Sequence, residues 1–506
     1  MANPLFDRLF APHQDRQTPF LHLADGAVMT HDAFLRISAR FANALDALGI
    51  APGDRVAVQI DKSPEALAIY AACVRAGVVF LPLNTAYTAS EVSYFLENSG
   101  ASLFLCDGAA TSALEPVAQA AGARLHSLNG DGTGSFADLA ADQPDSHAPV
   151  DRTTDDLAAF LYTSGTTGRS KGAMLTQGNL LSNAQVLADY WRFTDRDVLL
   201  HALPIFHTHG LFVATNVTLA AGGAMIFLPR FDLDQMLRLM PQATAMMGVP
   251  TFYTRLLDDP RFDRDLTAHM RLFVSGSAPL LAETHVAFHE RTGHRILERY
   301  GMTETNMNTS NPYDGERRAG TVGFALPGTE VLITDPATGQ TLPTGEIGQI
   351  EVRGPNVFKG YWQMPEKTAE ELRDSGFFIT GDLGRIDADG YIHIVGRNKD
   401  LIISGGYNIY PKEIELLLDD QPGVLESAVI GVPHPDFGES VVGVLVPRPG
   451  ASLDTDAIAA AIAGDLARFK QPRRLVVLDD LPRNTMGKVQ KNLLREQFAD
   501  TFAPAN

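Results

Sequence analysis

The chain as far as Tyr300 alternates between strand-like and helix-like segments, and this alternation restricts the possible folds more than any other feature. Helical patterns cover 33–48 and 64–76, and the apolar runs RVAVQI, VVFLPL and LFLCD lie between and after them. Another helix is expected near Ala118, whereas the Gly/Asp/Pro-rich stretch 129–153 is expected to be a loop. This order is typical of an α/β fold with a largely parallel sheet.

The same alternation resumes at Ala158. The runs HALPIF, AMIFLP, AMMGVP and MRLFVSG are separated by amphipathic helical stretches, which predicts a second sheet in the same body. The uncharged stretch 211–228 is long enough to be weighed as a membrane span. Because Asn216 and the pair Gly222-Gly223 interrupt it, we expect a buried helix followed by the core strand AMIFL.

The pattern changes after Gly320. Short runs (EVLITD, GQIEVRG, YIHIVG) punctuated by Gly, Pro and Asp indicate an antiparallel β region up to His393. After GRNKD we expect a helix at 411–418, strands ESAVIGVP and VVGVLVP, a helix at 456–467, strand RRLVVL and a last helix after Gly487. The prediction is therefore an α/β fold with a large domain (1–398) of two parallel-rich sheets plus an antiparallel region, and a small α+β domain (399–506).

Composition excludes several classes of protein. The 506 residues exceed what one core usually organises. Forty-one basic against sixty acidic residues give a net charge of -19, which disfavours nucleic acid as a partner. Two cysteines, Cys73 and Cys106, build neither a disulfide framework nor a cysteine-rich zinc site. The N-terminus has no secretory pattern, so we expect a cytoplasmic protein that is not bound to a membrane.

The segment TSGTTGRSK runs from an apolar strand into a loop of glycines and hydroxyl residues. Such a loop suits polyphosphate, because glycines permit close backbone approach and hydroxyls and a lysine add donors. It is not a Walker A loop, since only two residues separate Gly165 from Gly168. A plain glycine–serine turn is the alternative, but it would need neither the lysine nor the run of hydroxyls. The expected phosphate-binding residues are Thr163, Ser164, Gly165, Thr166, Thr167, Gly168 and Lys171.

This loop resembles the phosphate loop of adenylate-forming enzymes, the family of acyl- and aryl-CoA synthetases, luciferases and peptide-synthetase adenylation domains. Four further motifs follow in the order of that family along nearly the whole chain. They are ERYGMTET, FFITGDLG, GRNKDLIISGGYNIYPKEIE and LPRNTMGKVQK. The resemblance implies ATP, Mg²⁺ and coenzyme A as cosubstrates and cofactor, and an acyl-adenylate as intermediate.

The resemblance also implies roles for single residues. Lys488 would bridge the acid and the α-phosphate, where two anions approach each other. Thr303 would donate to the α-phosphate, and Glu304 would hold Mg²⁺ through a carboxylate oxygen. Tyr300 would stack on adenine, Asp382 would accept hydrogen bonds from the ribose hydroxyls, and Arg397 would contact the same nucleotide. Ala278 and Glu298 are assigned to the ATP site as well.

In this family the small C-terminal domain rotates between two half-reactions, so we expect 399–506 to be mobile. Lys399 matches the hinge position. Ser404, Gly405 and Gly406 would line the channel of the CoA thiol, where glycines leave room for a narrow chain. Taken alone, this loop could equally be an ordinary glycine turn.

Arg299 points to the acid that is activated. A buried guanidinium is costly unless it is paired, and it grips a carboxylate with two hydrogen bonds. A substrate with a second carboxylate is therefore expected, with His207 and Ser277 completing a small polar pocket. ERYGMTET and LPIFHTHG together look most like malonyl-CoA synthetases, which act on malonate and methylmalonate. In the alternative, Arg299 pairs with a protein carboxylate and the pocket takes a monocarboxylic acid.

Three other functions remain open at this point. The chain could be a ligase of the same family for a short fatty, aromatic or hydroxycinnamic acid. It could load a carrier protein, although no carrier-like segment follows Lys491. It could also sense nucleotide without turning it over, which the set of Lys488, Glu304 and Asp382 disfavours. The expected partners are small molecules, and the sequence does not indicate an oligomeric state.

Overall fold

The computed structural model describes residues 2–163, 170–404, 407–466, 468–484 and 487–502. They form two compact units. The first comprises Met1–Val331 and Val352–Phe378, and the second comprises Leu332–Glu351 and Ile379–Asn506. The second unit thus takes in strands that precede residue 398, whereas the hinge-based domain boundary after residue 398 stays a prediction.

A nine-stranded sheet spans the first unit, in the order β15-β14-β13-β12-β11-β9-β10-β1-β2. Its central strands are parallel, and antiparallel pairs close both edges. The strands are β1 (Pro19–Leu23), β2 (Val28–Thr30), β9 (Val198–His201), β10 (Ala224–Phe227), β11 (Ala245–Gly248), β12 (Leu272–Ser275), β13 (Leu297–Met302), β14 (Asn306–Ser310) and β15 (Phe324–Ala325). Strands β9 to β12 are apolar and almost wholly buried, as expected for a parallel sheet covered on both faces.

The same unit contains a six-stranded sheet, formed by residues 55–176, in the order β6-β5-β3-β4-β7-β8. Its strands are β3 (Arg55–Gln59), β4 (Val79–Pro82), β5 (Leu103–Cys106), β6 (Arg124–Ser127), β7 (Leu157–Thr163) and β8 (Lys171–Thr176). All pairs are parallel except β7–β8. Cys73 and Cys106 are buried and unbridged, in agreement with the apolar surroundings of both.

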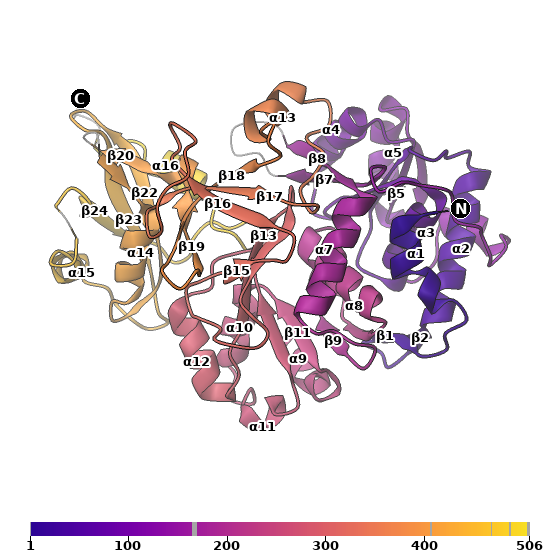
Figure 1. The fold of residues 1–506 in the computed structure, drawn as a ribbon, viewed down its shortest axis with the longest axis horizontal. Helices are drawn as coiled ribbons and strands as arrows, with labels where there is room; N and C mark the ends of the chain where they lie inside the picture. Colours follow the sequence, from indigo (N-terminus) through magenta and orange to yellow (C-terminus); the bar gives the residue numbers. More distant parts are fainter. Residues whose placement is uncertain (1, 164–169, 405–406, 467, 485–486, 503–506) are drawn as a thin grey trace. The chain divides into compact units, whose positions relative to one another are not determined.

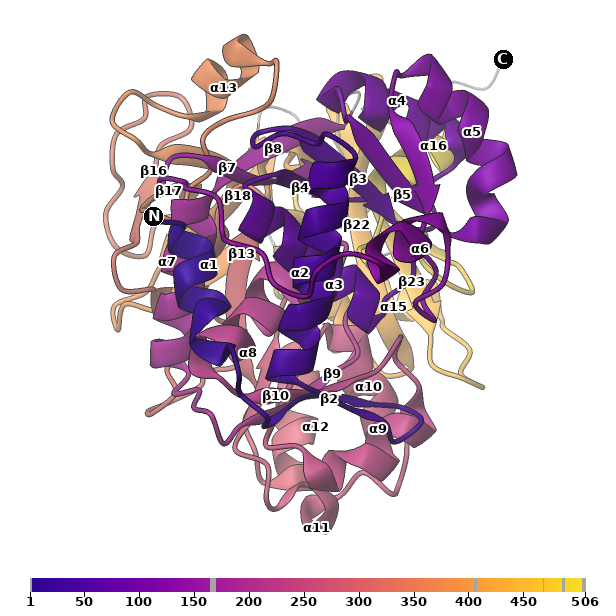
Figure 2. The same ribbon diagram turned by 90° about the vertical axis from the view of Figure 1, so that its right-hand side faces the viewer.

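The helices of the first unit begin and end where the sequence offers caps. The Ser63 hydroxyl caps α3, Pro64 opens it, and Gly77 ends it in the left-handed region (φ 69°). Helices α2 and α3 pack side by side, and α7 lies against α8 (Figures 1 and 2). The helices are α1 (Pro4–Leu9), α2 (His31–Ala47), α3 (Pro64–Ala76), α4 (Ala89–Ser99), α5 (Thr111–Ala120), α6 (Ser135–Ala141), α7 (Gln177–Tyr190), α8 (Asn216–Ala221), α9 (Leu233–Leu239), α10 (Pro250–Leu257), α11 (Arg264–Thr267), α12 (Ala282–Thr292) and α13 (Pro365–Glu371), with 3-10 turns at Ala11–His13, Gly108–Ala110 and Met240–Gln242.

Two expectations about this unit were wrong in detail. The connection 129–153 is not a bare loop, because α6 lies within it. The second run of strands does not all enter the second sheet, since β7 and β8 complete the six-stranded sheet and β1 and β2 complete the nine-stranded one. Sequence order alone does not determine which sheet a strand joins, because that choice depends on long-range pairing.

The uncharged stretch 211–228 is a buried helical segment followed by β10, as expected, but its first turns are a π-helix. This segment, η3 (His209–Thr215), runs directly into α8. Within the described residues, no helix is long and apolar enough to cross a membrane.

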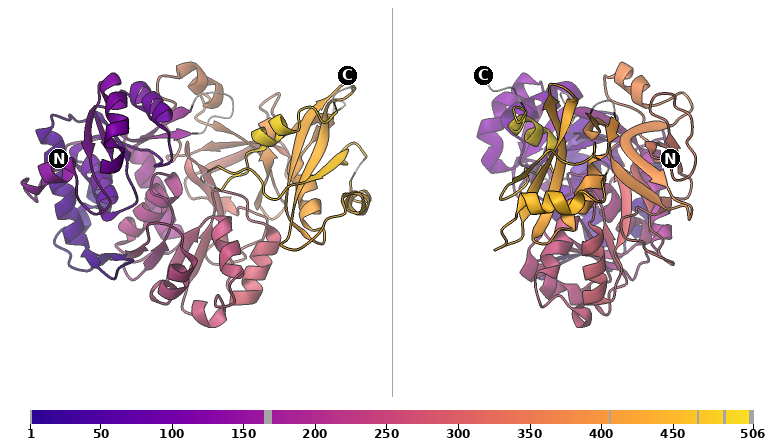
Figure 3. Two further views of the ribbon diagram at one scale, coloured as in Figure 1. Left: turned by 180° about the vertical axis from the view of Figure 1, so that it is seen from behind. Right: turned by 90° about the vertical axis from the view of Figure 1, so that its left-hand side faces the viewer.

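In the described residues of the second unit, two sheets are combined with three α-helices. One sheet has the order β16-β17-β18-β19, with β16 (Glu330–Thr334), β17 (Gly348–Arg353), β18 (Phe378–Ile386) and β19 (Ile392–Arg397). The other contains β20 (Ile402–Ser404), β21 (Tyr407–Ile409), β22 (Val424–His434), β23 (Gly438–Pro447) and β24 (Arg474–Val477), drawn in orange to yellow in Figure 3. Helices α14 (Pro411–Asp419) and α16 (Lys491–Gln497) pack on β22, and α15 (Thr455–Ile462) packs on β24. The predicted α/β fold class is confirmed, although α15 ends before the expected residue 467.

Candidate active site

The β7–β8 hairpin carries the predicted phosphate loop. Thr163 and Lys171 face each other at the open end of the antiparallel pair, and the Thr163 hydroxyl lies 3.5 Å from the carbonyl oxygen of Lys171. The two strands thus fix both ends of the predicted phosphate-binding segment. Five of the predicted phosphate ligands, Ser164, Gly165, Thr166, Thr167 and Gly168, lie outside the described residues.

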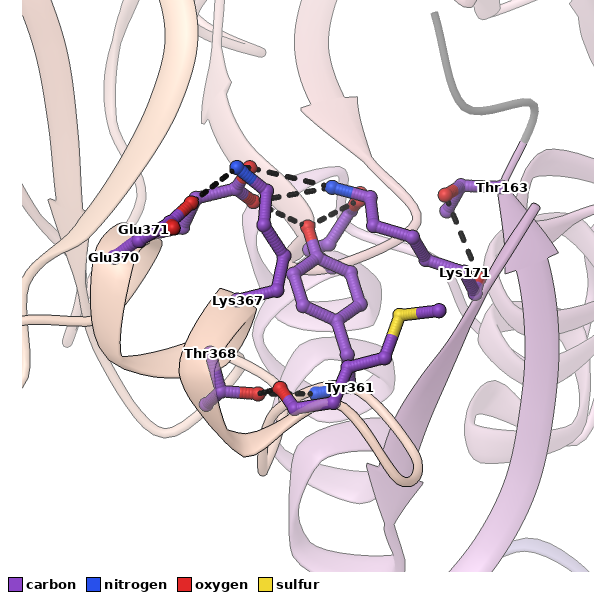
Figure 4. Close-up of polar contacts among 9 residues, drawn as sticks. Thr163, Lys171, Tyr361, Lys367, Thr368, Glu370 and Glu371 are labelled. Atoms are coloured by element: carbon purple, nitrogen blue, oxygen red, sulfur yellow. Dashed lines mark hydrogen bonds and ion pairs between the residues drawn. The ribbon is translucent and has the colours of Figure 1, made fainter. Parts of the chain in front are cut away.

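Lys171 lies in a cluster of charges that the segment after β17 brings to the hairpin (Figure 4). Its ammonium is 3.3 Å from the carboxylate of Glu371 at the end of α13, and 4.1 Å from the ring centroid of Tyr361. Lys367, one turn earlier on α13, reaches the same carboxylate at 3.0 Å. Burial acts to raise the pKa of Glu371, but the Tyr361 hydroxyl and the two lysines outweigh it, so that the pKa is lowered and Glu371 is ionised.

Glu304 joins this cluster from the other sheet of the unit. It lies in the turn between β13 and β14, and its backbone carbonyl accepts the N–H of Phe358. Its carboxylate is 2.9 Å from the Tyr361 hydroxyl, which is also 2.6 Å from Glu371. The residue is 5% exposed, and burial raises the pKa of Glu304. The tertiary structure thus links the predicted phosphate lysine to the predicted metal ligand through one tyrosine.

The donor set around Glu304 fits Mg²⁺. This ion prefers oxygen ligands and is commonly held by one or two carboxylates together with substrate phosphates. Glu304 offers one buried carboxylate, and within the described part of the chain no three His, Cys, Asp or Glu side chains gather as a closed metal cage. When bound with ATP, Mg²⁺ would neutralise charge on the phosphates.

Arg299 is a buried cation in β13, with 3% of its surface exposed. Its Nε and Nη2 have no hydrogen-bond partner among the residues that the structure describes. The guanidinium lies directly against Gly276, where an added Cβ would stand 2.4 Å from Cζ of Arg299. Burial lowers the pKa of Arg299 to about 9, so the group is charged at neutral pH. An ionised group with unused donors in this position is suited to binding an anion.

Ser277 and His209 lie next to this cation. The Ser277 hydroxyl is 3.2 Å from Nδ1 of His209, the first residue of the π-helix. Burial, and secondarily the charge of Arg299, lower the pKa of His209 well below its usual value, so its imidazole is neutral. Ser277 has a positive φ of 72°, which is unusual for serine and recurs at binding sites. The three residues come from β13, the loop after β12 and the π-helix.

The other predicted residues of the first unit are close in sequence to the residues of these two clusters. Glu298 is buried in β13, and one of its carboxylate oxygens accepts the N–H of Leu280 at 3.4 Å. The half-buried residues are Tyr300 in β13, Thr303 beside Glu304, Ala278 after Ser277, and His207 before the π-helix. The roles predicted for them are not tested by this geometry.

In the second unit, Asp382 and Arg397 are directly opposite each other in the antiparallel pair β18–β19. Asp382 is 5% exposed, and its carboxylate is 3.0 Å from Nε of Arg397. Gln349 donates to the backbone carbonyl of Asp382 at 2.9 Å, which fixes that strand. Two residues predicted to contact one nucleotide therefore lie together, although they are 15 positions apart in the sequence.

Three further predicted positions belong to the second unit. Lys399 is exposed in the 3-10 turn Asn398–Asp400, between β19 and β20. Ser404 is buried at the end of β20, whereas Gly405 and Gly406 lie outside the described residues. Lys488 is exposed, and its backbone N–H donates to the side chain of Asn484 at 3.0 Å.

Sequence reasoning missed His209, Tyr361, Lys367 and Glu371. His209 lies two residues after the predicted His207, and its contact with Ser277 depends on the π-helix, which the sequence does not reveal. Tyr361, Lys367 and Glu371 lie in KGYWQMPEKTAEEL, some 190 to 200 residues from Lys171. No local pattern connects segments that far apart, so tertiary structure was needed to identify them.

Comparisons with known proteins agree with this fold. The family model of AMP-binding enzymes matches residues 10–362, and that of the AMP-binding enzyme C-terminal domain matches 413–488. The chain therefore belongs to the AMP-binding enzyme family. It is, more narrowly, an acid–thiol ligase of the AMP-forming acyl-CoA synthetase type, which uses ATP, Mg²⁺ and coenzyme A.

Three relatives illustrate the range of likeness. A feruloyl-CoA synthase of Amycolatopsis sp is 39% identical over 94% of both chains, and a malonate–CoA ligase of Arabidopsis thaliana is 34% identical over 90% of this chain and 79% of its own. The crystal structure of ATP-bound MatB from Rhodopseudomonas palustris is 58% identical and has a TM-score of 0.97, covering 99% of this chain and 100% of that one. The predicted resemblance to this family is confirmed.

Proposed function

We propose that the protein ligates malonate, or its methyl derivative, to coenzyme A. The observation that carries this proposal is the buried Arg299 guanidinium, whose Nε and Nη2 have no partner among the described residues. A monocarboxylic acid would leave these two donors unused, whereas the far carboxylate of a dicarboxylic acid would pair with them. Relatives named as a malonate–CoA ligase and as MatB support the same choice.

The proposed reaction has two balanced steps. In the first, the near carboxylate oxygen attacks the α-phosphorus of ATP, the bond to the β-phosphate bridging oxygen breaks, and pyrophosphate leaves. In the second, the CoA thiolate attacks the acyl carbon, a thioester forms, and AMP leaves with the former acyl oxygen. Both steps bring anions together, so catalysis depends on positioning and on cations where charge develops.

The residues take the following roles in this proposal. Lys171 holds the outgoing pyrophosphate, Thr303 donates to the α-phosphate and Glu304 holds the magnesium. Arg299 orients the acid by its far carboxylate, with Ser277, His207 and His209 forming the polar wall of the pocket. The nucleotide is held by Asp382 and Arg397, with Tyr300 on adenine and Ala278 and Glu298 nearby, while Lys488 bridges acid and α-phosphate.

In the second half-reaction, rotation at Lys399 brings Ser404, Gly405 and Gly406 to the path of the thiol. We propose this alternation from the family resemblance. Its test is described among the predictions below.

A panel of acids tests the proposal. Malonate, methylmalonate, acetate, benzoate and ferulate are each incubated with ATP and Mg²⁺, and AMP is measured with and without CoA. We expect the highest kcat/KM with malonate or methylmalonate and AMP formation that depends on CoA. A preference for ferulate would instead favour the second candidate, which the 39% identity to a feruloyl-CoA synthase supports.

The same panel separates the remaining alternatives. AMP formation that CoA does not accelerate would favour loading of a carrier protein. Absence of AMP with every acid would favour a nucleotide sensor.

A further inference from the structure

Lys62 is a lysine that neither the ATP cluster nor the acid pocket accounts for. It follows β3 by three residues, yet its side-chain nitrogen reaches the last residues of two strands of the other sheet, β9 and β10. It lies 2.8 Å from Nδ1 of His201, 2.9 Å from the carbonyl oxygen of His201, and 4.3 Å from the ring centroid of Phe227. These contacts occupy the donors of the Lys62 side chain without a carboxylate, and burial lowers the pKa of Lys62 well below its usual value.

His201 transmits this contact to the π-helix. The residue is fully buried, and its Nε2 is 2.8 Å from the carbonyl oxygen of Gly210. Nε2 therefore carries the proton and Nδ1 accepts from Lys62, which sets one tautomer. Burial, together with the charge of Lys62, lowers the pKa of His201 well below its usual value and keeps the ring neutral.

Gly210 is the second residue of the π-helix, and the surrounding backbone leaves no space for a side chain at this position. Its carbonyl also accepts the hydroxyl of Thr215, five residues later, at 2.9 Å. A Cβ at Gly210 would stand 2.0 Å from the carbonyl oxygen of Pro204. π-helical turns are rare and are frequently found at functional sites. Here the residue before Gly210 is His209, which contacts Ser277 beside Arg299.

We propose that Lys62 is a positioning residue for the acid pocket, acting through His201 and Gly210 on the first turn of the π-helix and so on His209 and Ser277. The proposal rests on the proposed function only in taking Arg299, Ser277 and His209 as the acid pocket. Lys62 itself touches neither acid nor ATP in this account. It therefore differs from Arg299, whose role is direct.

The test replaces Lys62 by methionine, which keeps most of the length and removes the donors and the charge. We expect the KM for the preferred acid to rise by about tenfold, the factor that about 1.4 kcal/mol represents, while the KM for ATP changes by less than twofold. Lys62→Arg, which retains donors and charge, is expected to recover most of the loss. Lys359→Met is the matched control, because Lys359 is exposed and its ammonium lies 3.3 Å from the carbonyl oxygen of Asp155, in a segment that carries neither His201 nor the π-helix.

A double-mutant cycle separates positioning from general stability. If Lys62 acts through His209 and Ser277, then Lys62→Met combined with Ser277→Ala raises the acid KM little more than the worse single change does. If the fold-changes in acid KM of the two single variants multiply in the double variant, the proposal is overturned. An unchanged acid KM in Lys62→Met, or an equal rise in the KM for the acid and for ATP, would also overturn it. If Lys62→Met does not fold, Lys62→Gln takes its place with the same expectations.

The preferred acid is determined first, with the unaltered protein. A preference for a monocarboxylic acid would refute the dicarboxylate proposal but leave the Lys62 proposal testable with that acid. If Lys62→Met raises the KM for that monocarboxylic acid, the result supports the positioning role of Lys62 but not the dicarboxylate proposal.

Discussion

Replacing Arg299 by methionine should weaken the enzyme toward malonate and at the same time stabilise its fold. Both effects have one cause, because the guanidinium is buried with two nitrogens unpartnered among the described residues. Loss of a buried charge-assisted contact costs about 2 to 5 kcal/mol, which corresponds to a fall in kcat/KM of about 30-fold to several thousand-fold. Methionine fills similar space without a charge that has to be desolvated.

The stabilisation follows from the charge that is removed. Burial lowers the pKa of Arg299 to about 9, well below its value in the unfolded chain, so below pH 9 the group is protonated in both states and the destabilisation by burial is fully present. The destabilisation is relieved only as the pH rises above about 9. At pH 7.5 we therefore expect Arg299→Met to unfold with a free energy higher by at least about 1 kcal/mol, measured as a raised Tm.

The assays are steady-state kinetics with malonate and with ATP, and thermal unfolding with and without malonate. Malonate should raise the Tm of the unaltered protein and leave that of Arg299→Met unchanged. Arg271→Met is the matched control, since Arg271 pairs with the buried Asp197 at 2.5 Å and its loss should lower the Tm without affecting the malonate KM. Unchanged malonate kinetics, or a lowered Tm in Arg299→Met, would refute the reasoning.

Three further outcomes are expected. Tyr361→Phe removes the hydroxyl between Glu304 and Glu371 but keeps the ring beside Lys171. The KM for ATP should therefore rise about fivefold or more, while the KM for the acid stays within twofold, both measured by pyrophosphate release. An unchanged KM for ATP would count against a role of this cluster in binding ATP. Lys399→Pro should slow thioester formation more than adenylate formation in single-turnover experiments, and equal loss of both would argue against a hinge at this position. In the second unit, burial raises the pKa of Asp419 to about 6, so the ionised carboxylate destabilises the fold fully above pH 6 and not below about pH 4. Asp419→Asn should therefore raise the free energy of unfolding at pH 7 by at most about 3 kcal/mol, seen as a higher Tm, and should leave it unchanged at pH 4. An equal effect at both pH values would contradict this.

Local patterns in the sequence were sufficient for most elements of secondary structure. Helix α3 begins at Pro64 and ends at Ala76, as the Ser63–Pro64 and Gly77 signals predict, because caps and glycines act within a few residues. The same holds for β3, β4, β10 and β12, whose apolar runs are short and bounded by turn residues. The family and the type of reaction were also readable, since five motifs occur in order.

The pairing of distant segments was not readable in the same way. Which sheet receives β7 and β8, and the presence of α6 within 129–153, depend on contacts across the chain rather than on local propensity. Likewise, Tyr361 and Glu371 reach Lys171 only because α13 folds back onto the β7–β8 hairpin.

The amino-acid sequence by itself thus determined the class of enzyme, and it predicted the phosphate-binding motif and Arg299 as the residue that points to the acid. Only the tertiary structure decided that Arg299 is buried with donors unused among the described residues, that His209 contacts Ser277, and that Lys62 reaches the strand before the π-helix. The physical reason is that a sequence motif shows only which chemical groups lie within a few residues of one another. Burial, unpaired charge and the aim of a side chain depend on which distant segments pack together.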